Sequence, residues 1–482
     1  MKSLHYHWTN LDLSTRRYIA FLFLLGLILR VVYVFSIDLI PKDHLGIDMD
    51  AVEYDYLGLN IAEGRGVVDR FGDPTALRFP AYLYFLGLIY FIFGHHHLVA
   101  LLFQAGMGAL SPLLIYFTAR QLIAERPSRV AGVVASCYPS FIYYAGWLMT
   151  ENLFLLLISL LLFLTVSLKD AASWRKIFLM GVLVGLLGLT RGVGLPFIFI
   201  VPVYVFLRLK GAFRLRLIRA AVLLGVGILM LVPWTIRNYN AYHRWMLPSS
   251  EGGVVLWIGF NPVLLQYYEY DEAFAYLDSV GRDQARSEEF YRLLRNHNYF
   301  GLTGMKRIFE LYYPDEPLPQ SEPEASERLT RKVLALLKES PMLWVVKSFK
   351  QIFRFWHVLD ERGRYVWGYA FIFPFFLVGA WTLRRRLLDF APLYLYILVL
   401  YGVAIVFFAD ARFRMPFEGI LIIPAAFAMD QFLQRFQRFY AGYAMLILWF
   451  AINYFLRLNS LQVRLAIRTV AGALGFPLTE MD

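Results

Sequence analysis

The chain has 482 residues, of which 59% are hydrophobic, and its mean hydropathy is +0.52. This composition excludes an ordinary soluble protein, which must cover its core with polar residues. The formal net charge is +11, but the Lys and Arg residues gather in short segments between apolar runs. That pattern is typical of a membrane topology signal rather than of a nucleic-acid-binding surface.

Apolar runs recur along the chain, and those of about 20 residues can cross the roughly 30 Å hydrocarbon core as helices. The runs cover residues 18–37, 98–119, 152–168, 193–207, 218–235, 366–383, 391–408, 416–433 and 439–456. A further short span is expected at about 130–148. The first run follows Arg16 and Arg17 and has no small-residue cleavage site after it, so we predict a retained anchor rather than a signal peptide. We therefore predict an all-α polytopic membrane protein with about 11–13 transmembrane helices, interfacial helices and a small outer domain.

Residues 80–94 decide the orientation, because this apolar segment is short for a membrane crossing. If it lies in the interface, the later basic loops fall on the same side as the N-terminus, as the positive-inside rule requires. We adopt that topology, with a cytoplasmic N-terminus in the cytoplasmic (inner) cell membrane. Residues 41–94 and 237–365 then face outside, and the chain divides into 1–236, 237–365 and 366–482.

The second outer region is expected to contain a flexible loop at 313–327 and an amphipathic helix at 328–339, before Pro341. The C-terminal tail contains Arg457, Arg464 and Arg468 among apolar residues and resembles an interfacial helix. Its side of the membrane stays open.

Acidic residues gather in the first outer region, just beyond the first apolar run: Asp48, Asp50, Glu53 and Asp55. Carboxylates held at a membrane surface suit general-base chemistry on a hydroxyl group. The structural alternative is that they cap a helix or are solvated charges. Glu151 is a further candidate acid at the outer end of the 130–148 span, where Thr150 as a helix N-cap is the alternative.

Five arginines are expected at the outer ends of spans, against the general inside bias: Arg78, Arg191, Arg237, Arg412 and Arg414. Guanidinium groups at this level would suit a lipid phosphate, since each can donate to two oxygens at once. The alternative for each is contact with ordinary headgroups.

The sequence predicts no metal site and no cofactor, although a divalent metal is not excluded. His95, His96 and His97 are adjacent, and three adjacent histidines cannot converge on one ion from a single helix face. No phosphate-binding Gly-lysine loop, nucleophile elbow or internal repeat is present. The single cysteine, Cys137, allows no internal disulfide.

Several short motifs follow one another in a recognisable order. They are Asp50-Ala-Val-Glu53-Tyr54, Leu57-Gly-Leu-Asn-Ile-Ala-Glu-Gly-Arg-Gly66, Arg78-Phe-Pro-Ala-Tyr82, Phe93-Gly94, Tyr138-Pro139, Thr150-Glu151, Leu189-Thr-Arg191, Pro233-Trp-Thr-Ile-Arg-Asn-Tyr239, Gly259-Phe-Asn261-Pro262 and Arg412-Phe-Arg-Met-Pro416. In this order the sequence resembles the GT-C membrane glycosyltransferases related to protein O-mannosyltransferases and to the lipid A aminoarabinose transferase. These are glycosyltransferases of the family 39 and 83 kind.

The resemblance implies a polyprenyl-phosphate-linked sugar donor, inversion at the anomeric carbon, and Asp50 as the base. It also implies that residues 80–94 form a juxtamembrane helix. The sequence departs from the O-mannosyltransferase pattern at Ala51, where that family has Glu after the Asp. A lipid, glycan or protein acceptor is therefore expected, with no choice among them, and membrane lipids are the other partners.

Two other functions stay open. An O-antigen polymerase or ligase would also present arginines and a large loop outside, but it would not need the acidic first region. A transporter or flippase of lipid-linked sugars would have interrupted segments in corresponding halves of the chain, and we find no such pairing.

Overall fold

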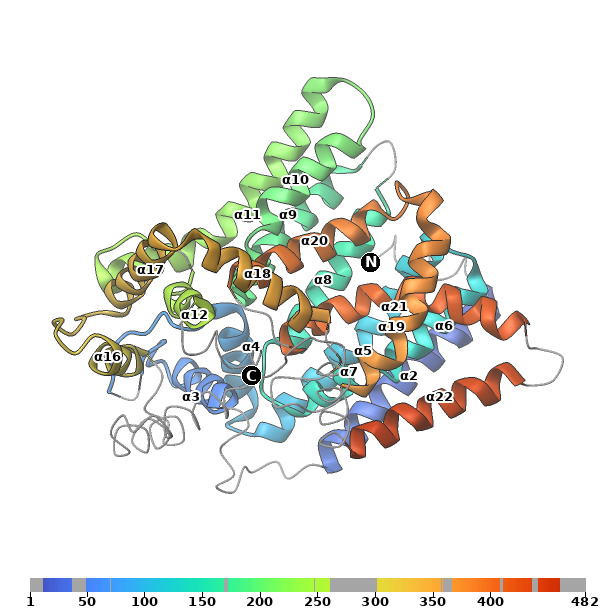
Figure 1. Ribbon diagram of the computed structural model, residues 1–482, viewed down its shortest axis with the longest axis horizontal. Helices are drawn as coiled ribbons and strands as arrows, with labels where there is room; N and C mark the ends of the chain where they lie inside the picture. The colour runs from blue at the N-terminus through green and yellow to red at the C-terminus, as the bar shows by residue number, and fades with distance from the viewer. Residues whose placement is uncertain are drawn as a thin grey trace.

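The computed structural model describes residues 12–36, 49–69, 71–168, 172–246, 248–260, 301–356, 358, 366–407, 411–435 and 441–459, and helices dominate this part (Figure 1). The α-helices are α2 (Leu13–Ser36), α3 (Met49–Ala62), α4 (Pro80–Phe93), α5 (His97–Leu122), α6 (Glu125–Ser136), α7 (Pro139–Tyr143), α8 (Glu151–Val166), α9 (Trp174–Thr190), α10 (Phe197–Arg208), α11 (Phe213–Tyr242), α12 (Glu251–Phe260), α16 (Gly301–Tyr312), α17 (Glu322–Glu339), α18 (Pro341–Trp356), α19 (Trp367–Leu383), α20 (Ala391–Val406), α21 (Ala411–Arg435) and α22 (Ala441–Leu458). Short 3₁₀ turns are η1 (Tyr144–Gly146), η2 (Gly192–Gly194) and η3 (Arg384–Arg386). The described residues form no β-strand, and Val68 and Pro74 make an isolated bridge.

The all-α prediction is confirmed. Four described helices are long and apolar enough to cross a membrane, namely α2, α5, α11 and residues Arg412–Arg435 of α21. Six other apolar segments form helices of 10–17 residues, which at 1.5 Å per residue are shorter than the hydrocarbon core. The chain is a multi-pass integral membrane protein. The predicted C-terminal tail beyond residue 459, with Arg464 and Arg468, lies outside the described residues.

Two local predictions are wrong. The expected span at 130–148 is broken, because α6 ends at Ser136 and a new helix starts at Pro139, whose ring and missing N–H cannot continue the preceding helix. The amphipathic helix expected at 328–339 begins earlier, at Glu322, where the Ser321 hydroxyl accepts a hydrogen bond from the Glu324 amide. The segment 313–327 is therefore only partly a loop. In addition, α9 is a helix that the apolar runs did not include.

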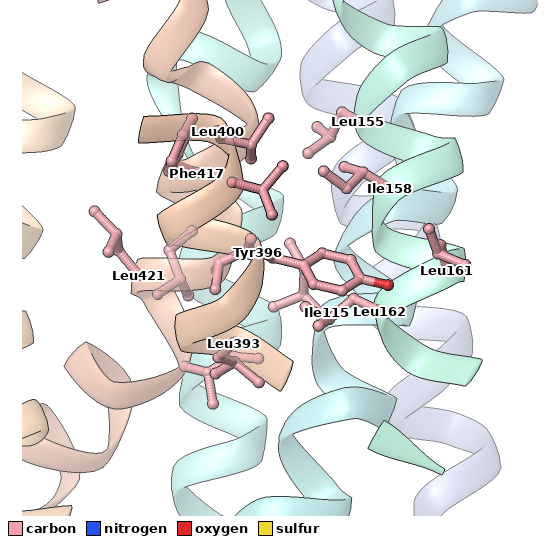
Figure 2. Close-up of a cluster of buried hydrophobic side chains, with 14 of the residues drawn as sticks. Ile115, Leu155, Ile158, Leu161, Leu162, Leu393, Tyr396, Leu400, Phe417 and Leu421 are labelled. Atoms are coloured by element: carbon pink, nitrogen blue, oxygen red, sulfur yellow. The ribbon is translucent and has the colours of Figure 1, made fainter. Parts of the chain in front are cut away.

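The main hydrophobic core lies where α8 packs against α5, α20 and α21 (Figure 2). Leucine and isoleucine side chains from these helices interlock, and all those labelled in Figure 2 are buried. The Tyr396 hydroxyl lies 2.8 Å from the Thr165 hydroxyl, so this polar atom is satisfied inside the core. The core thus fixes the spacing of α8 and α21, whose ends carry candidate site residues.

The helices α3 and α4 pack closely against each other. A Cβ atom at Gly87 would lie 2.6 Å from the Ile61 side chain, so only glycine allows this approach. The opposite face of α4 exposes Tyr84, Leu88 and Phe91, which recur at helical spacing. One face is packed on protein and one apolar face is open, as an interfacial helix requires, and the role of residues 80–94 stays a prediction.

The helices α12, α16 and α17 form a layer beside α3 and α4, here called the side layer (Figure 1). Its buried anchor is Glu322, which accepts hydrogen bonds from the Thr75 hydroxyl at 2.7 Å, the Ala76 amide at 2.8 Å and the Ser250 hydroxyl at 2.9 Å. The side layer is therefore tied to the segment that leads into Arg78. The predicted domain boundary at 236 falls inside α11, which continues to Tyr242.

We predict that α4 does not cross the membrane, because it has 14 residues and lies along α3. In a Cys137→Ser background, single cysteines at His96 and at Glu125 are probed in intact cells with a membrane-impermeant thiol reagent. The cysteine at position 96 should react from outside and the one at 125 only after permeabilisation. If α4 crosses the membrane, the two positions exchange sides, so reaction from outside at position 125 but not at position 96 would contradict this topology.

Candidate active site

The segment between α3 and α4 carries Arg78 into a polar centre. Gly64, just after α3, has φ of +76°, a conformation that side chains other than glycine's rarely adopt. The chain then turns back, and the Asn60 amide holds it by donating to the Val68 carbonyl at 2.9 Å. These contacts explain why the Asn-Ile-Ala-Glu-Gly-Arg-Gly motif precedes a functional arginine: it builds the turn that returns the chain to the start of α3.

Arg78 is almost fully buried and makes ion pairs with three carboxylates. It contacts Asp50 Oδ1 through Nη2, and its Nε donates to Glu53 Oε2 at 2.6 Å. Its Nη1 reaches Glu251 Oε1 at 3.3 Å. Asp50 and Glu53 lie one turn apart on α3, so both carboxylates face the same guanidinium.

A second arginine joins this group to the far helices. Arg412, in the first turn of α21, donates through Nη1 to Asp50 Oδ2 at 2.6 Å, and its Nε contacts Glu151 Oε1. The same Glu151 oxygen accepts from Arg191 Nη1 at 2.7 Å. Glu151 is wholly buried, and Thr150 makes no capping hydrogen bond from its side chain but accepts one from Arg191. The capping alternative for Thr150 therefore does not hold.

These contacts form one continuous array, here called the ion-pair network, which joins residues far apart in sequence. Its members are Asp50, Glu53, Arg78, Glu151, Arg191, Glu251 and Arg412. Asp50 keeps 23% of its side-chain surface exposed and Arg412 keeps 21%, whereas Glu151 has none. A ligand can therefore reach the network at Asp50 and Arg412. Glu151 is not accessible and holds Arg412 through their ion pair.

Burial and charge act differently on the carboxylates of the network. Burial alone would raise the pKa of Asp50, but the guanidinium groups of Arg78 and Arg412 hold it well below its usual range. Burial raises the pKa of Glu53 to about 7 although Arg78 opposes this, and burial also raises the pKa of Glu251. Because Glu53 and Glu251 both contact Arg78, protonation of either one makes the network more positive.

Two of the five predicted phosphate-binding arginines lie elsewhere. Arg237 donates to the Thr75 carbonyl at 2.8 Å and also to the Val67 carbonyl. It therefore fixes the backbone of the segment before Arg78 and does not contact the network carboxylates in these hydrogen bonds. Arg414 is fully buried, pairs with Glu418 at 2.9 Å and donates to the Phe355 carbonyl. The structure thus brings together Arg78, Arg191 and Arg412 but not the other two.

Two further predicted acids are not among the described members of the network, and the sequence analysis did not find two charged residues that the structure buries or pairs. Asp48 lies outside the described residues, and Asp55 faces away from the network toward His95 and His97. The sequence analysis did not find Glu251, because it lies 173 positions from its partner Arg78. The only local signal is the pair Ser249-Ser250, which precedes the helix that Glu251 begins. Arg30 was also missed, although a charge inside the apolar run 18–37 is itself a signal; it is fully buried and donates to the Gly26 carbonyl at 2.9 Å.

Chemically, the network offers an accessible carboxylate between two guanidinium groups. Such guanidinium groups can bind an oxyanion, and the carboxylate can take a proton from a nucleophile that lies beside it.

Comparison with known proteins supports a relation to sugar transfer. Residues 75–236, which contain Arg78, Glu151 and Arg191, match the family model described as dolichyl-phosphate-mannose-protein mannosyltransferase. The comparison with curated protein sequences gave no significant match.

Solved structures show the same helical arrangement. The oligosaccharyltransferase of Archaeoglobus fulgidus tethered to an acceptor peptide superposes with a TM-score of 0.53 at 15% identity, over 93% of this chain and 54% of that one. The archaeal oligosaccharyltransferase AglB of the same organism, in complex with an inhibitory peptide and a dolichol-phosphate, gives 0.50 at 14% identity, over 97% and 56%. The chain therefore resembles these oligosaccharyltransferases in fold.

The chain spans about half the length of those oligosaccharyltransferases. ArnT from Cupriavidus metallidurans bound to undecaprenyl phosphate also matches, at 14% identity over 87% of this chain and 79% of that one, but its TM-score of 0.37 supports no further argument. The expected resemblance to GT-C enzymes is confirmed at the level of fold and family segment.

We predict that Arg414 stabilises the fold rather than binding a ligand. Arg414→Ala leaves the Glu418 carboxylate buried without its ion pair, which costs about 3–5 kcal/mol, and should lower the thermal unfolding temperature in detergent strongly. The double replacement of Arg414 and Glu418 by Met should recover most of that loss, because no charge is then left unpaired. If Arg414→Ala keeps normal stability but loses donor binding, Arg414 is a ligand-binding residue, as the sequence had suggested.

Proposed function

We propose that this chain is a GT-C glycosyltransferase that transfers a sugar from a polyprenyl-phosphate-linked donor to a hydroxyl acceptor on the outer face of the membrane, with Asp50 as the general base. The observation that carries the proposal is the position of Asp50, whose two carboxylate oxygens contact Arg78 and Arg412. A base and two phosphate-binding groups thus meet at one accessible point.

A lipid phosphate suits the charge of the network. A phosphodiester is an anion, and the guanidinium groups of Arg78 and Arg412 can bind its oxygens by charge-assisted hydrogen bonds. The matched family model is named for dolichyl-phosphate-mannose, and one of the solved relatives holds a dolichol-phosphate. Both are lipid-linked phosphates, which supports the same donor class for this chain.

The low pKa of Asp50 implies that the donor binds before Asp50 takes a proton from the acceptor. While Arg78 and Arg412 donate to Asp50, its carboxylate is a weak base. A donor phosphate that accepts hydrogen bonds from the same guanidinium groups competes with Asp50 for them, and the basicity of Asp50 rises. Donor binding therefore activates the base, which limits proton abstraction to the loaded enzyme.

The transfer step then follows. The acceptor oxygen attacks the anomeric carbon as the bond from that carbon to the phosphate oxygen breaks. The electron pair of the broken bond stays on the lipid phosphate, where Arg78 and Arg412 stabilise the added charge. The acceptor proton passes to Asp50 as the new bond develops, because a free hydroxyl is too weak an acid to lose it beforehand. Attack opposite the leaving group inverts the anomeric centre.

Glu151 and Arg191 serve this reaction by position. The buried Glu151 carboxylate binds Arg412 and Arg191 at once, which fixes the first turn of α21 beside the N-terminus of α8. Arg191 also lies over the Phe413 ring, with its Cζ 5.1 Å from the ring centre. The acceptor stays open among lipid, glycan and protein hydroxyls, since no contact of the network selects one.

We predict that Asp50→Asn abolishes transfer while leaving donor binding within a few-fold of the wild type. The amide keeps the size of the side chain but cannot take the proton, and general-base catalysis contributes about 10²–10⁴ in rate. Transfer is measured in nanodiscs with a radiolabelled polyprenyl-phosphate sugar and the acceptor fraction of the envelope. Glu63→Gln is the control, because Glu63 is an exposed acid on the same segment. Near-normal turnover of Asp50→Asn would eliminate Asp50 as the base.

The raised pKa of Glu53 predicts that donor affinity depends on pH. Below about pH 7 Glu53 is protonated and the network is more positive, whereas above it the carboxylate is charged and competes with the donor for Arg78. A polyprenyl-phosphate sugar is a phosphodiester, so its own charge stays constant between pH 6 and pH 8.

The donor should therefore bind several-fold more tightly at pH 6 than at pH 8, and Glu53→Gln should remove most of this dependence. Equilibrium binding of the labelled donor in nanodiscs is the measurement, with Glu63→Gln again as the control. A donor affinity that rises with pH, or a dependence unchanged in Glu53→Gln, would contradict this role of Glu53.

A further inference from the structure

A second polar group lies at the junction of α3, α4 and α5, on a different face of α3 from Asp50. Asp55 follows Asp50 by five residues, which is about 140° around the helix. Its Oδ1 lies 2.9 Å from His95 Nε2, and its Oδ2 lies 3.0 Å from His97 Nε2. The two histidine Nε2 atoms are 3.2 Å apart. We call these three residues the histidine–aspartate cluster.

The spacing of these atoms is that of ligands around one metal ion. In a tetrahedral zinc site with bonds of 2.0–2.1 Å, neighbouring ligand atoms are about 3.3–3.4 Å apart. The three ligand atoms of the cluster all lie within 4.8 Å of one another, and both imidazoles turn the same nitrogen toward the carboxylate. Small outward movements of the three side chains would make room for an ion between them.

The chain geometry explains why three consecutive histidines can supply two converging ligands. His95 does not belong to a helix: it follows Gly94, which ends α4 with φ of +79° and reverses the chain. His97 is the first residue of α5. His95 and His97 are thus placed on either side of a bend and reach the same carboxylate, whereas His96 lies exposed outside the cluster. The sequence argument against a metal assumed that the histidines share one helix face, and the bend at Gly94 removes that assumption.

We propose that the histidine–aspartate cluster binds one divalent transition-metal ion, with zinc as the best match, through Asp55, His95 and His97. Two imidazoles and a carboxylate are a common zinc ligand set, and water completes the fourth position. The Tyr90 hydroxyl donates to Asp55 Oδ1 at 2.6 Å and so orients the carboxylate, as partners of metal ligands usually do. This proposal does not rest on the proposed sugar transfer.

The position of the ion indicates its role. It would join α3, which carries Asp50 and Glu53, to the junction of α4 and α5. A bound ion would therefore stiffen the helix that holds the base without touching the ion-pair network. Its open fourth position, at side chains that are about a third exposed, also allows exchange with the medium.

The test is direct metal binding by the full-length chain in nanodiscs, purified with a tag that contains no histidine. After removal of metal with a chelator, zinc is titrated against a competing chromophoric chelator, and retained zinc is measured by mass spectrometry. The wild type should hold one zinc per chain. His95→Ala and His97→Ala should lose it, and Tyr90→Phe should bind about 10–100-fold more weakly. His96→Ala is the matched control and should bind as the wild type does.

Zinc should also raise the thermal unfolding temperature of the wild type and of His96→Ala, but not that of His95→Ala. This second readout separates a lost site from a misfolded variant, because a folded His95→Ala chain melts cooperatively with and without zinc. Absence of stoichiometric zinc in the wild type, or an equal loss in His96→Ala, would overturn the proposal.

Discussion

The burial of Glu151 is the constraint on which the site depends. A carboxylate with no exposed surface, at the start of an apolar helix, is tolerated only when opposite charges compensate it. Arg191 and Arg412 do so from the end of α9 and the start of α21, and they thereby join α8 and the following α9 to α21, which is distant in sequence. Arg412 then extends the array to Asp50 on α3, so that an accessible carboxylate is held by a buried one.

The other half of the site is assembled by backbone contacts rather than by charge. The segment before Arg78 is held by Arg237, which donates to its carbonyls, and by Glu322, which accepts from Thr75 and Ala76. The side layer therefore positions the backbone just before Arg78, and this backbone determines the direction from which Arg78 contacts Asp50. Since Glu251 also comes from the side layer, a movement of α12 would change both the charge and the openness of the network.

Local sequence patterns predicted most helices, because the length of an apolar run and the position of a proline determine helix formation within a single segment. They failed at Tyr138-Pro139, where an apolar run hides a break, and at Glu322, where a capping serine extends a helix. The acid Asp50 and the arginines Arg78, Arg191 and Arg412 were found as candidates by type and place. The sequence does not distinguish these three arginines from Arg237 and Arg414, because the distinction lies in their contact partners. Those partners are up to 362 positions away and come close only through the packing of the helices. The same holds for Asp55 and His95, which are 40 residues apart.

The central claim is that the lipid phosphate binds between Arg78 and Arg412 and displaces their contacts to Asp50. The most direct measurement is a cryo-EM structure of the chain in nanodiscs with a polyprenyl phosphate. We expect the phosphate within hydrogen-bonding distance of both guanidinium groups, with the carboxylate of Asp50 released from at least one of them. A phosphate bound elsewhere, with the ion pairs of Asp50 to Arg78 and Arg412 intact, would contradict the account.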